Sequence, residues 1–365
     1  MAITRLEIDL EALRHNYQYL RSKLTDGVRM MAVVKAYGYG SEAQAVAIEL
    51  EKLGVDYFAV AYVSEGVALR DAGVQTPILV LHPQPDNFEE MVERCLEPSI
   101  YSARMMELFS AFAKAKNQTN YPIHLKFNTG LNRLGFWESD VSWILDRLHE
   151  KNSIKVKSIF SHLVASEDKA EEEFTLNQIL SFTNISKELL EGLDYVPFLH
   201  QSNTSAIINY PRAQFDCVRS GIGLYGYGNS EEETARLKPV ARLKSVISQI
   251  HKIAPGESVG YNRAFKASDY MTTATIPIGH ADGISRIYGN GVGYMTVQGE
   301  KAPIIGNVCM DMTMIDITGI DCKEGDEVEI FGDITGADTL AQNAGTISYE
   351  LLTAVGQRVK RVVLK

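Results

Sequence analysis

Lys35 is the residue whose surroundings first suggest chemistry. It ends an apolar run, MMAVVK (30–35), and is followed by AYGYG. A lysine at the end of an apolar strand is partly desolvated, which lowers the pKa of its amine and favours the neutral form that makes a Schiff base. The glycines let the backbone approach a ligand closely. The alternative is a lysine that turns outward into solvent, and YGYG is not the GxGxxG fingerprint of a dinucleotide site.

Other reactive side chains follow later apolar runs. Arg133 lies in NTGLNRLG, His162 in FSHLVA and Arg219 in VRSGIGLYG, and a further run is followed by Asn203, Thr204 and Ser205. Taken singly, a histidine is usually a structural group, and an arginine usually makes a surface ion pair. Together these residues indicate a site for a phosphate-bearing cofactor, with a lysine and an arginine at its two ends.

The elements that must position these residues alternate between two kinds. Helical patterns such as 64–71, 102–116 and 174–190 separate nearly all of eight candidate strands, at 30–35, 57–62, 77–82, 96–100, 123–128, 155–160, 196–200 and 215–220. This alternation predicts parallel βα units in an α/β fold, and eight units predict a closed (β/α)8 TIM barrel. An open doubly wound sheet is the alternative. In a barrel, all the residues above meet at the C-terminal ends of the strands, where the backbone of Gly221 and Ile222 suits a phosphate.

The chain changes character after Glu231–Glu233. Short alternating runs with Gly, Pro and Asp turns replace the helical patterns, which predicts a mainly antiparallel β domain. We therefore expect a cofactor-binding barrel over residues 9–234, with Asp9 as the N-cap of its first helix. A C-terminal β domain is expected over 235–365, and residues 1–8 are expected to pack with it.

Composition excludes several classes of function. The net charge is −10 and no block of Lys and Arg occurs, which argues against a nucleic-acid partner. No run approaches the roughly 18 apolar residues of a membrane span, and the N-terminus lacks the apolar core of a secretory signal. We therefore expect a cytoplasmic protein. The four cysteines are far apart in sequence, which suits neither a zinc site nor a disulfide framework, so no metal is expected: Cys95, Cys217, Cys309 and Cys322.

Several motifs resemble those of bacterial alanine racemases, in the same order and over nearly the whole chain. They are VVKAYGYG, NTGLNRLGF, SNTSA, RSGIGLYG, VGYN, PIGHADGISR, GNVCMDM and ISYELLTAVGQRVKR. The resemblance implies an isomerase that depends on pyridoxal 5′-phosphate (PLP) and interconverts L- and D-alanine, supplying D-alanine for peptidoglycan. It also implies a homodimer in which each active site is completed by the partner subunit.

The resemblance assigns a role to individual residues. Lys35 matches the lysine that forms the internal aldimine with PLP, Arg219 the arginine facing the pyridine nitrogen, and His162 the residue supporting that arginine. The positions that hold the cofactor phosphate match Tyr39, Asn203, Thr204, Gly221, Ile222 and Tyr349. An arginine at the pyridine nitrogen stays protonated and cannot donate its proton to the ring, which limits side reactions such as transamination.

Inversion of a stereocentre needs one proton removed from one face and another delivered to the opposite face. Tyr261 matches the second catalytic base, donated across the dimer. Arg133 and Met310 match residues that hold the substrate carboxylate, and Asp311 lies in the same loop. Lys126 matches a position that is carbamylated in several relatives, where it orients the arginine corresponding to Arg133.

The chain departs from the usual family pattern at several positions. Most important is His280, which replaces a tyrosine that constricts the entrance to the site. A histidine is shorter and can carry charge near neutral pH, so the entrance can be wider or more polar. The others are Gly38, Ser41, Asn128, Thr204 and Asn307.

Three other functions are compatible with parts of this pattern. One is a broad-specificity or serine racemase, which the sequence does not separate from an alanine racemase. Another is a PLP-dependent decarboxylase, which would place an acidic residue where Arg219 stands and a cysteine opposite the lysine. The third is a PLP-homeostasis protein, which would lack the C-terminal β domain and Tyr261.

Overall fold

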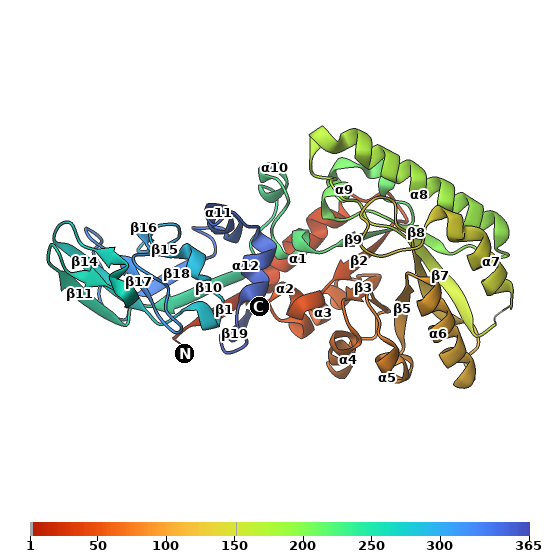
Figure 1. Cartoon of the computed structure of the whole chain (residues 1–365), viewed down its shortest axis with the longest axis horizontal. Helices are drawn as coiled ribbons and strands as arrows, with labels where there is room; N and C mark the ends of the chain where they lie inside the picture. The colour runs from red at the N-terminus through yellow and green to blue at the C-terminus, as the bar shows by residue number, and fades with distance from the viewer. Residues whose placement is uncertain (1–2, 151) are drawn as a thin grey trace.

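The computed structural model describes residues 3–150 and 152–365. It is elongated, with a barrel at one end and a group of β-sheets at the other (Figure 1). The eight predicted strands are confirmed, and they close into a parallel barrel in sequence order. They are β2 (Arg29–Val33), β3 (Tyr57–Val60), β4 (Ile78–Val80), β5 (Leu96–Ile100), β6 (Tyr121–Lys126), β7 (Ile154–Phe160), β8 (Phe198–His200) and β9 (Cys217–Ser220). Because β9 pairs with β2, the open doubly wound alternative is excluded.

Helices pack around the outside of the barrel (Figure 1). They are α1 (Leu10–Arg21), α3 (Ala43–Lys52), α4 (Val63–Asp71), α5 (Phe88–Glu93), α6 (Ala103–Ala115), α7 (Val141–Glu150), α8 (Glu172–Gly192) and α9 (Thr204–Asn209). Asp9 caps α1 as its sequence indicates, because its Oδ1 accepts from Ala12 N at 2.9 Å. Such a cap stabilises a helix by about 1 kcal/mol. No helix in the described residues is long and apolar enough to cross a bilayer.

The C-terminal part is built from three sheets. The largest has the order β16-β15-β18-β10-β1-β19, a second has the order β11-β14-β17, and β12 pairs with β13. All pairings are antiparallel except β1 with β19. The bounds are β1 (Arg5–Asp9), β10 (Ala241–Val246), β11 (Gln249–Ile253), β12 (Ser258–Val259), β13 (Phe265–Lys266), β14 (Met271–Ile276), β15 (Tyr294–Val297), β16 (Glu300–Pro303), β17 (Thr313–Asp316), β18 (Glu327–Phe331) and β19 (Lys360–Leu364). Three further helices are α10 (Glu231–Thr234), α11 (Ala337–Asn343) and α12 (Ser348–Ala354). Glu233 of α10 bonds to Ser205 and Asn209 of α9, and α12 packs on α2 (Lys35–Tyr39).

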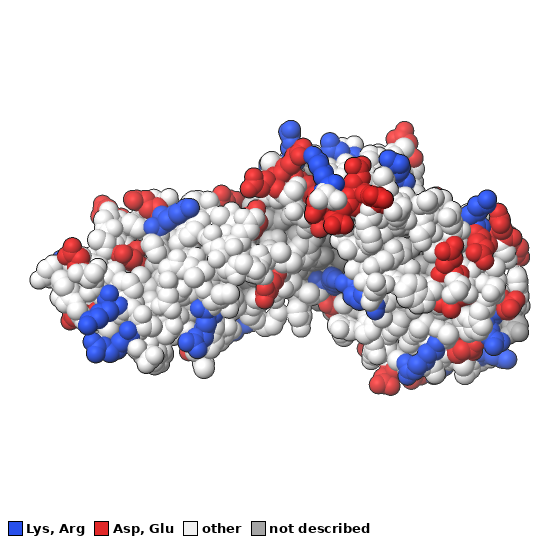
Figure 2. All heavy atoms as spheres, turned by 45° about the horizontal axis from the view of Figure 1, so that its top comes forward, with Lys and Arg blue, Asp and Glu red and all other residues white. Residues whose placement is uncertain are grey.

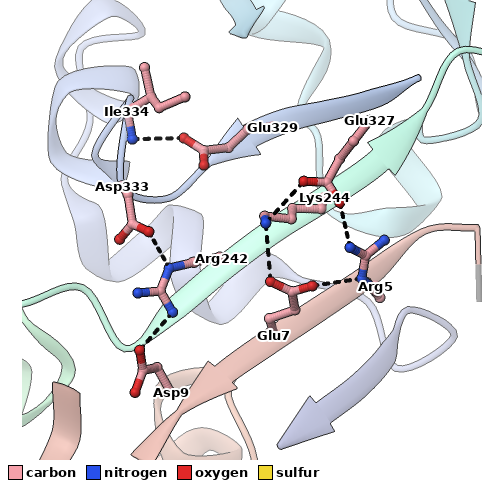
Figure 3. A network of polar contacts seen from close by, with 9 residues as sticks. All are labelled: Arg5, Glu7, Asp9, Arg242, Lys244, Glu327, Glu329, Asp333 and Ile334. Atoms are coloured by element: carbon pink, nitrogen blue, oxygen red, sulfur yellow. Dashed lines mark hydrogen bonds and ion pairs between the residues drawn. The ribbon is translucent and has the colours of Figure 1, made fainter. Parts of the chain in front are cut away.

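The first strand belongs to this C-terminal sheet, and β1 is inserted between β10 and β19. Residues 1 and 2 of the segment expected to pack there lie outside the described residues. Ion pairs reinforce the insertion (Figure 3): Glu7 accepts from Arg5 at 2.7 Å and lies 3.3 Å from Lys244, and Arg242 joins Asp9 to Asp333. Networks of this kind contribute more than isolated surface pairs, each of which is worth under about 1 kcal/mol.

Figure 2 shows how charged residues are distributed on one face of the molecule. On the face drawn in Figure 2, blue and red side chains are interspersed and large areas are uncharged. No continuous basic surface is visible on that face, in keeping with the net charge of −10.

Candidate active site

A cavity of about 720 Å³ lies at the C-terminal ends of the barrel strands. Most of the residues predicted to bind cofactor or substrate line it: Lys35, Tyr39, Lys126, Arg133, His162, Asn203, Thr204, Arg219, Gly221, Ile222 and Tyr349. They come from segments far apart in the sequence. Barrel closure brings all but Tyr349 together, because parallel strands deliver their C-terminal ends to one face. Tyr349 comes from the C-terminal part, and its ring lies 5.9 Å from that of Tyr39.

Lys35 begins a short turn instead of ending a strand. Strand β2 stops at Val33, and residues 35–39 form α2 (Lys35–Tyr39), in which φ is positive from Ala36 (52°) to Tyr39 (53°). Three of these four residues carry a side chain, so the left-handed backbone is strained. The carboxylate of Glu65 holds the turn by accepting from Ala36 N at 2.6 Å. Burial, reinforced by the charge of Arg133 and opposed by Glu65, lowers the pKa of the Lys35 amine.

Tyrosines and a glycine form one wall of the cavity. A Cβ added at Gly221 would lie 2.1 Å from the Tyr39 hydroxyl, so no other residue fits there without movement. The Tyr39 ring stacks on Tyr225 with centroids 4.5 Å apart. Tyr349 donates to the side chain of Asn229 at 3.2 Å. Burial raises the pKa of Tyr39, and burial raises that of Tyr349 to about 12, so both phenols keep their protons near neutral pH.

Arg219 is buried and held from several sides. Its NH1 lies 2.6 Å from His200 Nδ1, and its NH2 donates to the carbonyl of Ser161 at 2.7 Å and lies 3.1 Å from His162 Nδ1. Arginine can only donate, so both imidazoles must accept through Nδ1. Its Nε makes no hydrogen bond to any described residue, although the guanidinium is otherwise saturated. Burial lowers the pKa of Arg219 to about 10, and the group remains cationic near neutral pH.

Both histidines beside Arg219 are neutral. Burial first, and then the charge of Arg219, lower the pKa of His162 and of His200 well below the ordinary value. His162 was expected to support Arg219, and it lies within hydrogen-bonding distance of it. His200 was not singled out in the sequence. Its position at the end of VPFLH, directly before the polar QSNTS segment, was the available signal.

Four cationic side chains line the cavity. Lys126 and Arg219 are buried, Lys35 is half-buried and Arg133 is exposed. In the described part of the chain, none of them forms an ion pair with a carboxylate. Burial, followed by the charges of the other three, lowers the pKa of Lys126 to about 8. Uncompensated cations in one cavity favour ligands with several negative charges.

The loop that carries Arg133 is organised by Asn128. Its side-chain oxygen accepts from Asn132 N at 2.9 Å and Gly130 N at 3.2 Å, and its amide donates to the side chain of Asn132. The amide donor is a function that an aspartate would lack. Asn128 therefore holds the loop with both the oxygen and the amide of its side chain.

Another part of the cavity wall is formed by Asn203 and Thr204 at the start of α9. Asn203 caps this helix by accepting from Ala206 N at 3.0 Å, and it also accepts from Ser166 at 2.7 Å. The hydroxyl of Thr204 lies 3.2 Å from that of Ser220 on β9. Thr204, which was predicted to hold the phosphate, is thus in contact with the end of β9.

Five predicted residues do not line the cavity: Ser205, whose hydroxyl donates to Glu233 at 3.0 Å, and four that belong to the C-terminal part. Tyr261 begins the 3-10 helix η6 (Tyr261–Arg263) and is 75% exposed, and Met310 is 59% exposed. Asp311 accepts from Arg358 at 2.6 Å, and His280 donates its backbone N–H to Cys309. The last three are neighbours, because Ala281 N also donates to the carbonyl of Met310. A single chain therefore does not bring these four residues to Lys35.

The cavity has lining residues that sequence reasoning missed. Tyr62 and His82 face it from the ends of β3 and β4, and their rings lie 5.8 Å apart. Each directly follows an apolar run, in YFAVAY and PILVLH, so the same signal that marked Lys35 was present. Phe160 and Asn229 also line it. Among the described residues, no group of three or more His, Cys, Asp or Glu side chains could hold a metal ion.

Comparison with known families covers nearly the whole chain. Residues 8–229 match the family described as "Alanine racemase, N-terminal domain", and residues 240–363 match "Alanine racemase, C-terminal domain". The alanine racemase of Sorangium cellulosum is 36% identical over 377 residues, covering 99% of both chains. Alanine racemase 1 of Clostridium acetobutylicum is 36% identical over 369 residues, covering 98% of this chain and 95% of that protein.

Solved structures show the same architecture. The alanine racemase of Clostridium difficile 630 superposes with a TM-score of 0.92 at 33% identity, over 100% of this chain and 96% of the other. The alanine racemase of Bartonella henselae, which has covalently bound pyridoxal phosphate, superposes with a TM-score of 0.90 at 28% identity, over 100% of both chains.

Proposed function

The chain belongs to the alanine racemase family, and on that premise we propose that Lys35 and Tyr261 of the partner subunit act on opposite faces of alanine held in the barrel cavity. The enzyme is a PLP-dependent isomerase that interconverts L- and D-alanine. One observation carries the proposal: the Lys35 amine shares its cavity with buried cations that no carboxylate of the described chain pairs.

The residues of the cavity fit PLP. The close approach of Tyr39 to Gly221 leaves a narrow space at the wall, and Arg219 Nε is a fixed donor without a partner among the described residues. The cation cluster suits a phosphate and a substrate carboxylate together. PLP, when bound, supplies an electron sink that lowers the barrier to removing the Cα proton.

Separate groups would hold the two ends of the cofactor. Lys35 would attach it covalently through its amine. Arg219 would donate a hydrogen bond to the pyridine nitrogen without giving up its proton, while His162 fixes the position of the guanidinium. Phosphate contacts are assigned to Tyr39, Asn203, Thr204, Gly221, Ile222 and Tyr349. The raised pKa values of Tyr39 and Tyr349 support this assignment, because a protonated phenol can donate to a phosphate.

Racemisation needs a proton acceptor on one face of Cα and a proton donor on the other. The lowered pKa of Lys35 supports its role as one of them, since a larger fraction of the amine is neutral at working pH. Tyr261 is exposed in the single chain, together with Met310 and Met312, which are 59% and 49% exposed. Exposed apolar residues of this kind are typical of an interface, so a homodimer would deliver Tyr261 to the cavity of the other subunit.

Arg133 would bind the substrate carboxylate, with Met310 and Asp311 of the partner subunit beside it. We assign a carbamate to Lys126, because a pKa of about 8 leaves roughly a tenth of its amine neutral at pH 7, far more than at the ordinary value, and the neutral amine can add carbon dioxide. The carbamate would place a negative charge among the cations and orient Arg133. We further propose a cytoplasmic enzyme whose D-alanine enters peptidoglycan, and the four unpaired cysteines suit a reducing compartment.

Deuterium exchange tests the roles of the two bases. In D2O, the wild-type enzyme should introduce deuterium at Cα while it converts each enantiomer into the other. Lys35→Ala should abolish both conversions and the visible absorption of bound PLP, whereas Lys52→Ala, on the outer helix α3, should change neither. If Tyr261→Phe racemised alanine as fast as wild type, the assignment of Tyr261 as the second base would be refuted.

A further inference from the structure

A hydrogen-bonded chain crosses the interior of the barrel from Arg219 to a buried carboxylate. His200 Nε2 lies 2.9 Å from Ser158 Oγ, which lies 2.6 Å from His124 Nδ1. His124 Nε2 in turn lies 2.7 Å from Glu97 Oε2. Together with the 2.6 Å contact between Arg219 and His200, this makes a relay of five side chains.

The relay takes one residue from each of five consecutive strands. Glu97 is on β5, His124 on β6, Ser158 on β7, His200 on β8 and Arg219 on β9. His124 and Ser158 are paired in the register of β6 and β7. In a closed barrel of eight strands, β5 stands opposite β9, so the relay spans the barrel from wall to wall.

The two ends of the relay fix the direction of every hydrogen bond in it. Arg219 can only donate, and an ionised carboxylate can only accept. His200 must therefore accept at Nδ1 and donate from Nε2 to Ser158. The hydroxyl of Ser158 then donates to His124 Nδ1, and His124 donates from Nε2 to Glu97. Both imidazoles are neutral and carry their proton on Nε2.

No other protonation satisfies all five groups. If His124 carried two protons, Ser158 would receive an N–H from both rings, and its own hydroxyl proton would have no acceptor in the described chain. A buried donor without an acceptor is costly. The directed relay leaves none.

The three middle residues of the relay are sealed from water. His124, Ser158 and His200 are 0% exposed, and the side chain of Glu97 is 12% exposed. The rings of Phe160 and Phe198 both stack with His200, with centroids 4.8 Å and 5.4 Å away. Hydrogen bonds are electrostatically stronger, and polarise one another, in such a medium.

Glu97 supplies the negative charge of this core. Burial alone would raise the pKa of its carboxyl, but the hydrogen bond from His124, the charge of Lys157 and the hydrogen bond from Tyr57 oppose burial, and the pKa lies below its ordinary value. Tyr57 on β3 donates to the same oxygen at 3.2 Å. The carboxylate is therefore ionised, and no carboxylate of the described chain contacts Arg219 itself.

We propose that Glu97 is a positioning residue for racemisation: acting through His124, Ser158 and His200, it fixes the orientation and charge of Arg219 from the opposite wall of the barrel. This inference rests on the role of Arg219 at the pyridine nitrogen given above. It adds a distant anion to that role. The negative charge of Glu97 balances the positive charge of Arg219, whose direct hydrogen-bond acceptors are all neutral.

The protonation pattern is measurable without turnover. In holoenzyme labelled with 15N-histidine, the ring nitrogens of His124 and His200 should each report a neutral imidazole protonated on Nε2. Either ring protonated on Nδ1, or on both nitrogens, would overturn the directed relay. This measurement is independent of the two-base proposal, which could fail in the Tyr261→Phe test while the histidine pattern stands.

Two variants interrupt the relay at different points. Glu97→Gln removes the charge and keeps an acceptor, and Ser158→Ala removes one hydroxyl from the middle and is the smaller change should the first fail to fold. Each should lower kcat for alanine about tenfold, the equivalent of one weakened charge-assisted hydrogen bond, and leave KM within about twofold. Each should also shift the His200 ring resonances.

Glu49→Gln is the matched control. Glu49 is a buried carboxylate of α3 that pairs with Arg14 at 2.6 Å, and it has no contact with the relay. It should leave kcat and the His200 resonances as in wild type. The proposal is overturned if Glu97→Gln and Ser158→Ala keep the wild-type kcat, or if Glu49→Gln lowers kcat to the same extent.

Discussion

The Cα of Gly221 faces the hydroxyl of Tyr39 so closely that a Cβ built on it would stand 2.1 Å from that oxygen. The two residues come from opposite ends of the barrel sequence and meet because β2 and β9 are neighbours. Tyr39 in turn stacks on Tyr225 and is buried, so its hydroxyl has little freedom to withdraw.

Gly221→Ala should therefore weaken PLP binding by displacing the Tyr39 hydroxyl. Overpacking typically costs about 1–3 kcal/mol, so the dissociation constant of PLP should rise by about tenfold or more. In the Tyr39→Phe background the nearest ring atom would lie 2.9 Å from the new Cβ, and the added effect of Gly221→Ala should be smaller. Titration of cofactor-free protein with PLP measures all four values of this cycle. If Gly221→Ala raised the dissociation constant equally in both backgrounds, the contact between residue 221 and the Tyr39 hydroxyl would have no part in PLP binding.

Lys126 should make stability depend on pH. Its folded pKa of about 8 lies below the ordinary 10.5, so between these values the unfolded chain binds more protons than the folded one. The free energy of unfolding should therefore rise with pH across this window, by about 3 kcal/mol for this group. Urea titration of cofactor-free protein in buffer free of carbon dioxide should show this rise in wild type and its loss in Lys126→Met.

Lys114→Met, at an exposed position of α6, is the control for replacing a lysine with methionine. The same slope of stability against pH in wild type and in Lys126→Met would contradict the lowered pKa. Added bicarbonate should then bring a carbamate signal in 13C spectra of wild type that Lys126→Met lacks.

His280→Tyr should sharpen the preference for alanine. His280 is exposed beside Met310, where a larger ring would narrow the entrance to the partner's site. The ratio of kcat/KM for serine to that for alanine should fall by a few fold, since small steric differences are worth about 1–3 kcal/mol. His251→Tyr, at an exposed position of β11, serves as the control. An unchanged ratio would mean that His280 does not shape the entrance.

Much of the fold follows from local patterns. The apolar runs locate all eight barrel strands, and Asp9 marks the start of α1, because period and capping are properties of neighbouring residues. The end of β2 was placed two residues too late. An apolar run does not reveal that AYGYG adopts a left-handed turn, which depends on the tertiary hydrogen bonds of Glu65.

The site was less predictable from local sequence. Arg133 and His162 could be found because each follows a strand, and Arg219 because it lies near the end of one; closure of the barrel brings the three together. Glu97 and Ser158 lie within strands, and whether such residues face the barrel interior is decided by closure and register. Tyr261 was identified by resemblance alone, since nothing in a single chain connects it to Lys35.

Hybrid dimers test the central claim, a site shared between subunits, most directly. Lys35→Ala and Tyr261→Phe carry different affinity tags, are co-expressed, and the doubly tagged dimer is purified. One of its two sites then has both residues intact, and it should show about half the activity of a wild-type dimer, while each parent variant is inactive. A doubly tagged dimer as inactive as its parents would contradict the shared site, because it would mean that each chain uses its own Tyr261.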